Sequence, residues 1–157
     1  MADAFAPRAK NYRERVERSF AAQRVMRALG VSLARVAPGE VELHLAHRGD
    51  LTQQHGFLHA GVIASALDSA CGYAAFSLMP PEAEVLTVEF KINLLAPAAG
   101  EMFHCIGAVV KAGRTLSAAH GDAWAVRGGE RKLVAQMSAT LMSVTGRDDV
   151  RQQDGAT

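Results

Sequence analysis

The pattern that most constrains the fold is a run of four alternating apolar and polar segments that follows one long apolar segment. The alternating segments span residues 84–95, 101–112, 114–126 and 132–144. Alternation with a period of two is typical of strands that place one face on a core. Strands that follow one another without intervening helices favour an α+β fold with a largely antiparallel sheet over the strand-helix alternation of a parallel sheet.

Two further elements precede the long apolar segment. Apolar residues recur at roughly helical spacing through residues 11–29, among arginines and glutamates, which predicts an amphipathic surface helix that ends at Gly30. Two alternating runs, residues 31–37 and 40–46, flank a Pro-Gly pair whose turn geometry predicts a hairpin. The expected order is therefore helix, hairpin, long helix and four strands.

Size and charge limit the functions that are open to the chain. Its 157 residues suit a single domain over residues 11–145, with flexible ends at 1–10 and 146–157. The 17 basic and 16 acidic side chains give a formal net charge of +1, so no overall field attracts nucleic acid or an anionic membrane. The charged N-terminus is unlike a signal peptide, and no window is apolar enough to span a bilayer.

Cysteine usage favours a reducing compartment. Cys71 and Cys105 lie inside apolar segments and lack the C-x-x-C spacing of a redox or zinc site. We therefore expect reduced thiols in the core rather than a disulfide, and a soluble cytoplasmic protein.

The long apolar segment, residues 60–78, carries a single charged side chain, Asp68. Helical stepping of 100° per residue places small and polar residues on one narrow stripe: Gly61, Ser65, Asp68, Gly72 and Ala75. The opposite stripe, which we expect to pack on the sheet, holds Ile63, Ala66, Leu67, Ala70 and Ala74. Each glycine destabilises a helix by roughly 1 kcal/mol relative to alanine. The small stripe therefore favours close approach of another helix or a ligand.

Several motifs around this segment resemble those of one known family. The stretch Q-x-x-x-x-x-H-A-G-x-x-x-x-x-x-D runs from Gln53 to Asp68, TVEFKINLLAPA follows at residues 87–98, and VVKAGRTLSAA at 109–119. Over residues 30–145 the chain resembles the acyl-CoA thioesterases of the hotdog fold, specifically the PaaI-like (phenylacetate pathway) branch. The resemblance implies a long central helix wrapped by an antiparallel sheet, with an extra N-terminal helix here. It also implies a homodimer or a dimer of dimers, a homotetramer, with active sites at the dimer interface.

Two positions depart from the family's pattern. Ala60 stands where the family has the first glycine of H-G-G, and Gln53 where this branch usually has Asn. The role carried over at position 60 belongs to a backbone N–H group, which Ala also has if the backbone fits without positive φ. Gln is one methylene longer than Asn and can still point its amide into a site.

The resemblance assigns residues that suit thioester hydrolysis. Asp68 would attack the thioester carbonyl as a nucleophile or take a proton from water as a general base, and the sequence leaves both roles open. Backbone N–H groups near Ala60 and Gly61, in the first turn of the helix, would form an oxyanion hole. Gln53 would hold the water or the leaving thiolate, and Thr87 would hydrogen-bond that water or orient Asp68.

A second set of residues is expected to bind substrate: His59, Lys111, Gly113, Arg114 and Thr115. By the resemblance, the turn over residues 111–115 contacts the pantetheine or phosphates of CoA, since amides and cations hold phosphate well. In the family His59 is mostly structural, near the helix start. His55 and His59 have H-x-x-x-H spacing, but no Glu follows His55 and a glycine lies between them. We therefore expect neither a metal site nor a cofactor.

The strand over residues 84–94 is also expected to build the dimer. Its apolar set is Leu86, Val88, Phe90, Ile92 and Leu94, and its polar set is Thr87, Glu89, Lys91 and Asn93. Alternation predicts that the two sets occupy opposite faces. We expect this strand to pair with its copy across a two-fold axis, with the small stripe of the central helix near the partner.

Other functions stay open. Hotdog hydratases and dehydratases use a His paired with an acid, and an Asp followed by a His about five residues later would indicate that class. Five residues after Asp68, position 73 is Tyr. A non-catalytic acyl-CoA-binding module would keep the fold and the turn at Lys111 without needing Asp68 and Gln53 in one site. Asp68 could instead be a structural carboxylate satisfied by Ser or backbone donors. The sequence does not identify the acyl group of the substrate, because a cavity lined by Ala, Leu, Met and Phe suits aryl, medium-chain and long-chain groups alike.

Overall fold

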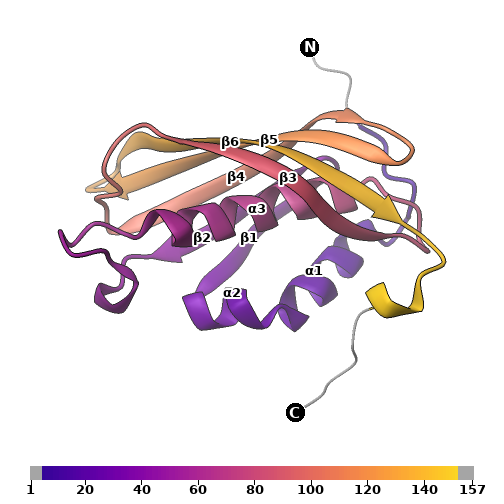
Figure 1. The fold of residues 1–157 in the computed structure, drawn as a ribbon, viewed down its shortest axis with the longest axis horizontal. Helices are drawn as coiled ribbons and strands as arrows, with labels where there is room; N and C mark the ends of the chain where they lie inside the picture. Colours follow the sequence, from indigo (N-terminus) through magenta and orange to yellow (C-terminus); the bar gives the residue numbers. More distant parts are fainter. Residues whose placement is uncertain (1–4, 152–157) are drawn as a thin grey trace.

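One antiparallel sheet forms the largest part of the structure, a computed structural model that describes residues 5–151. Its six strands lie in the order β1-β2-β4-β5-β6-β3 (Figure 1). Their bounds are β1 Val31–Ala37, β2 Glu40–Ala46, β3 Glu84–Leu94, β4 Met102–Ala112, β5 Leu116–Arg127 and β6 Glu130–Val144. Every pairing is antiparallel. The predicted hairpin, the four later strands and the α+β class are confirmed.

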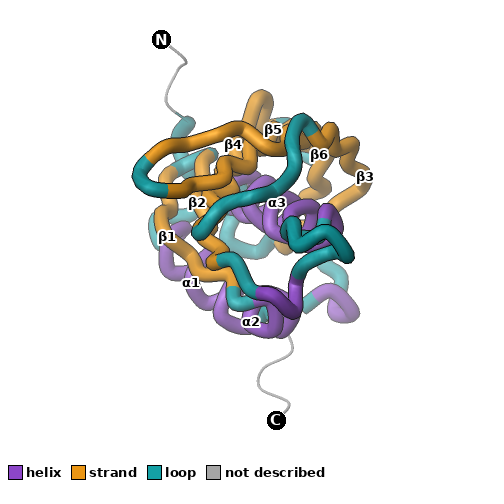
Figure 2. The backbone as a smooth tube through the Cα atoms, turned by 90° about the vertical axis from the view of Figure 1, so that its left-hand side faces the viewer, coloured by secondary structure: helices purple, strands orange, loops and turns teal. Residues whose placement is uncertain are grey.

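The long helix α3 (Ala60–Phe76) lies inside the curve of the sheet. Figure 2 shows the sheet above and beside α3, with α1 (Tyr12–Ala22) and α2 (Arg24–Leu29) below it. The predicted apolar stripe is buried, since each of its five residues is at most 1% exposed: Ile63, Ala66, Leu67, Ala70 and Ala74. The helix therefore packs on the sheet with the face that its sequence predicts. Two short 3₁₀ helices, Gly49–Leu51 and Asp148–Val150, complete the described elements.

Glycine on β4 and β5 lets α3 come unusually close to the sheet. A Cβ atom at Gly107 would lie 2.3 Å from the carbonyl carbon of Ala70 and 2.4 Å from the amide nitrogen of Cys71. Both are backbone atoms of α3, so they cannot turn away as a side chain could. Gly107 pairs with Gly121 on β5, where a Cβ atom would lie 3.0 Å from the Cys71 sulfur. The helix backbone thus rests directly on the strand backbone.

A β-bulge changes which residues of β3 face the helix. The predicted alternation put Thr87 and Glu89 on one face, but the register shifts between them. Thr87 lies opposite Leu141, and Phe90 lies opposite Ala139, and both of these β6 partners are buried. The extra residue therefore puts Thr87 on the inner face together with Phe90, while Glu89 turns outward.

Strand β3 lies at an edge of the sheet and exposes apolar side chains. Four of them are between 42% and 57% exposed: Leu86, Val88, Phe90 and Leu94. An exposed edge strand offers unpaired N–H and C=O groups, and exposed apolar side chains add a surface that favours association. This edge is the natural place for another chain to pair.

The N-terminal helix is broken, whereas the sequence predicts one continuous helix over residues 11–29. α1 and α2 meet at Gln23, whose backbone is extended, with φ −77° and ψ 98°. Its side-chain oxygen accepts a hydrogen bond from Ser69 Oγ of α3 at 3.0 Å. This contact between helices overrides the local helical pattern. α2 ends at Gly30, as predicted, with φ 72°.

The structure also bears on the thiols and the chain ends. Cys71 and Cys105 are unpaired and buried, as predicted. Ala9 is fully buried, whereas residues 1–4 and 152–157 of the expected flexible ends lie outside the described residues. The domain boundaries stay a prediction. Within residues 5–151, no helix has the length and apolar character needed to cross a membrane.

Because a side chain at Gly107 would meet the α3 backbone, Gly107→Ala should destabilise the protein strongly. Overpacking of this kind costs about 1–3 kcal/mol or more, which corresponds to a fall in melting temperature of several degrees for a chain of this size. Differential scanning calorimetry measures the fall. Gly49→Ala is the control, since its Cβ atom would meet nothing within 4 Å. Equal melting temperatures for the two variants would contradict the close approach.

Candidate active site

Asp68 and Thr87 meet between α3 and β3. Asp68 lies near the middle of α3 on the small stripe, and the bulge turns Thr87 toward it from the inner face of β3. Thr87 Oγ1 donates a hydrogen bond to Asp68 Oδ1 at 2.7 Å. The structure therefore brings together two of the predicted site residues, with the contact that the sequence analysis allowed for Thr87.

The environment of Asp68 shifts its acidity. Burial raises the pKa of Asp68 above its ordinary value of 3.8, and the hydrogen bond from Thr87 offsets only part of this rise. Desolvation penalises the charged form, whereas a donated hydrogen bond stabilises it, and here desolvation is the larger effect. A carboxylate with a raised pKa is a better proton acceptor near neutral pH than an ordinary Asp.

A cavity of about 370 Å³ opens beside this pair. Its walls come from the α1–α2 junction, α3 and β3, and its polar residues besides Asp68 and Thr87 include Ser19, Gln23, Arg24, Ser69, Tyr73 and Glu84. A Cβ atom at Gly72 would meet nothing within 4 Å, so the helix leaves open space one turn beyond Asp68. The small stripe thus gives a ligand access to the carboxylate.

The start of α3 is capped by a side chain that the sequence analysis placed only near the helix start. His59 is the N-cap residue, and its Nδ1 accepts a hydrogen bond from the Gly61 amide at 2.9 Å. The Gly61 amide, which the resemblance placed in the oxyanion hole, is therefore already hydrogen-bonded to the imidazole in this structure. Within residues 5–151 the Ala60 amide has no hydrogen-bond acceptor, so this first-turn donor is available.

Gln53 lies with Ala60 and not with Asp68. Both line a second cavity of about 520 Å³, which is mostly apolar and includes Phe57, Ile63 and Leu94. The Gln53 side-chain oxygen accepts a hydrogen bond from the His55 amide within the same loop. The structure therefore separates the predicted residues of one chain into two cavities.

Helix geometry explains this separation. Asp68 lies eight residues after Ala60, which corresponds to about 12 Å along the helix axis. A carbonyl oxygen held by the Ala60 amide would be far too distant for attack by Asp68 of the same chain, since reacting atoms must approach to about 3–3.5 Å. One chain thus holds the carboxylate and the amide donor at separate places.

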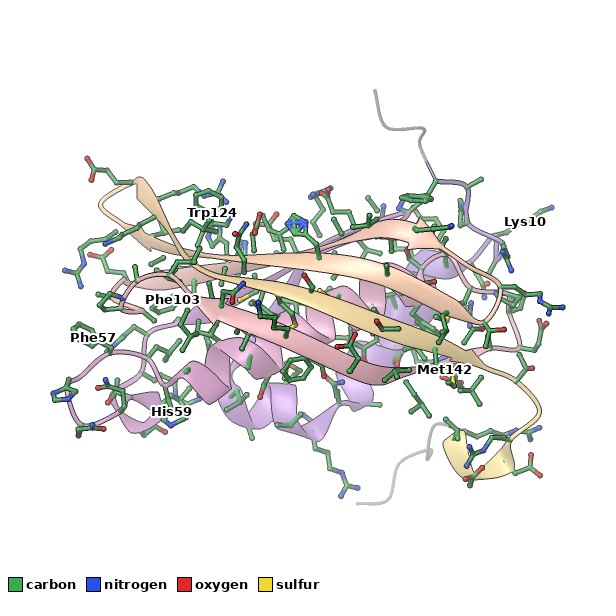
Figure 3. All side chains as sticks on the ribbon, turned by 45° about the horizontal axis from the view of Figure 1, so that its top comes forward. Lys10, Phe57, His59, Phe103, Trp124 and Met142 are labelled. Carbon is green, nitrogen blue, oxygen red and sulfur yellow. The ribbon has the colours of Figure 1, made fainter. Side chains whose placement is uncertain are left out.

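The predicted CoA turn lies at the far end of the sheet from the start of α3. In Figure 3, His59 and Phe57 lie at one end of the molecule and Met142 toward the other. Met142 pairs with Leu116, directly after this turn. Lys111, Arg114 and Thr115 are exposed there, and Gly113 is partly buried.

The sequence analysis missed the polar wall of the Asp68 cavity. Ser19 and Tyr73 lie within hydrogen-bond distance of each other, 3.3 Å between their hydroxyl oxygens, and Gln23 holds Ser69. The interpretation of residues 11–29 as a plain surface helix hid the contribution of Ser19 and Gln23. Their signal was weak, because polar residues near a helix break look the same in sequence as polar residues on a solvated face.

Comparison with known proteins adds to this geometry. A family model described as "Thioesterase superfamily" matches residues 55–132. A thioesterase family protein from Silicibacter pomeroyi, solved by crystallography, is 55% identical with a TM-score of 0.85, and the match covers 87% of this chain and 100% of that chain. The PaaI protein of the E. coli phenylacetic acid degradation operon has a TM-score of 0.77 at 18% identity, over 86% and 94% of the two chains. It shares the fold.

A curated relative from Halobacterium salinarum, named "Putative esterase", is 32% identical over 96 residues. That match covers 58% of this chain and 63% of the relative's length. Identity of 55% over the whole of a solved thioesterase family protein is far above the level at which only the fold is shared. We conclude that the chain belongs to the thioesterase superfamily and has the hotdog fold.

Proposed function

We propose that this protein hydrolyses an acyl-CoA thioester to a free acid and CoA, with Asp68 as the catalytic carboxylate. One observation carries the proposal: in a chain of the thioesterase superfamily, Asp68 is held by Thr87 at the wall of a cavity, on a helix stripe that leaves room for a ligand. The carboxylate either attacks the thioester carbon, forming an anhydride and releasing the thiolate, or takes a proton from an attacking water molecule. The hydrolase role is the common feature of both routes.

The developing negative charge on the thioester oxygen needs a donor. The Ala60 amide lies in the first turn of α3, where the helix dipole adds positive potential, so we assign it as the main oxyanion donor. The Gly61 amide would contribute only after the His59 ring turns away from it. Gln53, which lines the same cavity as Ala60, would hold the water molecule or the leaving thiolate.

The distance between Ala60 and Asp68 means that a complete site needs two chains. Antiparallel pairing of β3 with its copy would extend the sheet and place the two α3 helices antiparallel, side by side. A two-fold axis that passes α3 near Ala64, midway between the two residues, would bring the partner's Ala60 opposite Asp68. The exposed apolar residues of β3 support this pairing, because it would cover them. We therefore propose a homodimer with two shared sites, and a dimer of dimers as the larger assembly.

The same antiparallel arrangement gives the turn over residues 111–115 a role. This turn lies at the opposite end of the chain from Ala60, so in a dimer it would lie near the start of the partner's α3. Lys111 and Arg114 are exposed there and form no ion pair with any residue of 5–151, so they are suited to the phosphates of CoA, with Gly113 and Thr115 shaping the turn. The unpaired, buried thiols are consistent with a cytoplasmic location.

The first prediction concerns Asp68→Asn in a free-thiol assay over aryl, medium-chain and long-chain acyl-CoAs. The wild type should release thiol from at least one of them, and the variant should lose roughly 10²- to 10⁴-fold in kcat with a far smaller change in KM. Asp122→Asn is the matched control, since Asp122 lies on the outer face of the sheet with Gln136 and His120. Substrate hydration without thiol release would favour a hydratase, and binding without turnover would favour a binding module.

The stability of the same variant separates catalysis from structure. A pKa raised on folding means that the group's contribution to stability is present at low pH and is lost as pH rises through the folded-state pKa. At pH 7 the ionised Asp68 therefore opposes folding, and Asp68→Asn should leave the melting temperature unchanged or raise it. A lowered melting temperature with near wild-type kcat would identify a structural carboxylate and end the proposal.

The second prediction uses the Thr87 hydrogen bond. Thr87→Val removes the one interaction that lowers the pKa of Asp68, so this pKa should rise further. Because the deprotonated carboxylate is the active form, the acidic limb of the kcat/KM profile should move to higher pH. Thr140→Val is the control, since Thr140 Oγ1 donates an equivalent hydrogen bond to Glu89 on the outer face. An acidic limb that stays in place would show that Thr87 does not act on the catalytic group.

The third prediction tests the shared site by subunit mixing. Asp68→Asn and Gln53→Ala chains, carrying different tags and refolded together, would form heterodimers with one intact and one doubly altered site. About a quarter of wild-type activity should return, because half of the dimers are mixed and each has one of two sites. The reciprocal control mixes the wild type with a chain that carries both substitutions. Its heterodimers should be inactive, so only the wild-type homodimers contribute and the mixture should keep about a quarter of wild-type activity. About half of wild-type activity in the control, with none in the first mixture, would place the whole site in one chain.

A further inference from the structure

The outer face of the sheet carries a cluster of ligand side chains far from the cavity at Asp68. Glu42 and His44 are two residues apart on β2, so they project from the same face. His104 on β4 lies directly opposite His44 in the strand register. Among residues 5–151, these three form the one group of at least three His, Cys, Asp or Glu side chains with ligand atoms close enough to share an ion.

The three side chains converge on one point. His44 Nε2 lies 2.8 Å from Glu42 Oε1, and His104 Nδ1 lies 3.4 Å from the same oxygen. All three ligand atoms lie within 4.8 Å of one another. The two imidazole rings stack, with centroids 3.9 Å apart and planes 13° apart. The three residues lie on adjacent, hydrogen-bonded strands rather than on a loop.

We propose that Glu42, His44 and His104 form a binding site for a divalent transition metal of the zinc class, with the fourth coordination position open to water. Zn²⁺ is bound by His nitrogen and carboxylate oxygen at about 2.0–2.1 Å in a tetrahedron, whose ligand atoms are then about 3.4 Å apart. The separation from Glu42 Oε1 to His104 Nδ1, 3.4 Å, matches this value, whereas the separation to His44 Nε2 is shorter, at 2.8 Å. Imidazole lone pairs lie in the ring planes, which are nearly parallel here, so ion binding requires the two partly exposed rings to rotate out of the stack until both planes contain the ion.

The chemistry of the donor set agrees with this assignment. Two imidazoles and one carboxylate suit Zn²⁺ and similar ions better than Ca²⁺ or Mg²⁺, which prefer oxygen ligands. A neutral imidazole can carry its proton on either ring nitrogen, so Nε2 of His44 and Nδ1 of His104 can both present lone pairs without a change of charge. Arg35 lies 3.7 Å from the other Glu42 oxygen, Oε2, and leaves Oε1 to the two histidines. The positive charge of Arg35 should keep the affinity modest.

The cluster lies on the outer face of the sheet, away from the buried thiols and from the cavity at Asp68. Cys105 follows His104 but is buried on the inner side, so its sulfur is not a ligand. His104 also lies opposite Trp124 of β5, which Figure 3 places on the outer side of the sheet, away from α3. An ion here would join β2 to β4, which are sixty residues apart in sequence at His44 and His104. It should therefore stabilise the sheet without taking part in chemistry at Asp68.

The test uses the full-length chain without an affinity tag, stripped of metal with a chelator and titrated with Zn²⁺ by calorimetry. We expect one Zn²⁺ per chain, a rise in melting temperature with Zn²⁺, and a tetrahedral absorption spectrum when Co²⁺ replaces Zn²⁺. His44→Gln and His104→Gln should each weaken binding by roughly tenfold or more. His120→Gln is the matched control, since His120 on β5 pairs with Asp122 at 3.3 Å but has no third ligand, and it should bind as the wild type does.

A measurement on the wild type keeps the proposal testable if a variant fails to fold. Zn²⁺ should protect His44 and His104 from carbethoxylation, as read by mass spectrometry of peptides, and leave His120 reactive. The proposal is overturned if the metal-free wild type takes up no Zn²⁺, if both substitutions leave binding unchanged, or if protection falls on the loop residues His47, His55 and His59. These readouts do not depend on thioester hydrolysis, so failure here leaves the proposed function unaffected.

Discussion

The contact on which the rest of the structure depends is the packing of the α3 backbone against β4 at Gly107. A helix that rests this closely on a sheet needs small side chains at the contact, and three of the five residues of the buried stripe of α3 are alanines. The close packing also fixes the distance of α3 from the sheet, and with it the position of α3 beside the edge strand β3. Asp68 can then meet the hydroxyl of Thr87 at 2.7 Å, with no longer side chain in between. The position of the carboxylate is therefore a consequence of core packing.

The charge at Asp68 and the donors at the start of α3 have opposite requirements. A first-turn amide needs to stay free of protein acceptors so that a substrate oxygen can take its place, and the helix dipole is strongest there. The carboxylate needs partial burial, which raises its pKa, and this lies near the middle of the helix. A single straight helix cannot bring both to one carbonyl group. In the proposed dimer, two antiparallel copies would resolve this conflict, so that assembly would serve the chemistry as well as cover apolar surface.

Much of the fold could be predicted because local patterns agree with the tertiary structure. The hairpin at Gly39, the buried stripe of α3 and the four long strands follow from periodicity and turn residues alone. Two features could not be predicted in this way. The helix break at Gln23 depends on a hydrogen bond to Ser69, and the bulge at Thr87 depends on pairing with β6. Each arises from a contact between segments that are distant in sequence.

The residues of the candidate site could likewise be predicted in part from the sequence, whereas their arrangement could not. The motifs identified Asp68, Gln53, His59 and Thr87. Only the structure shows that Asp68 and Thr87 line one cavity and Gln53 another, and that His59 accepts the hydrogen bond of the Gly61 amide. The cluster at His104 was hidden for a related reason. The E-x-H pair on β2 is common in strands, and its third member is adjacent only because β2 and β4 are neighbours in the sheet. The cluster therefore depends on strand order, which periodicity does not encode.

The two buried thiols have a consequence for a protein that would release CoA. Burial raises the pKa of Cys71 and of Cys105 to about 12, and at neutral pH only about one thiol in 10⁵ is then a thiolate. Such thiols exchange very slowly with disulfides. The protein would therefore work in the presence of oxidised CoA without forming mixed disulfides with its own product, and it would keep its full complement of free cysteines under mild oxidative stress.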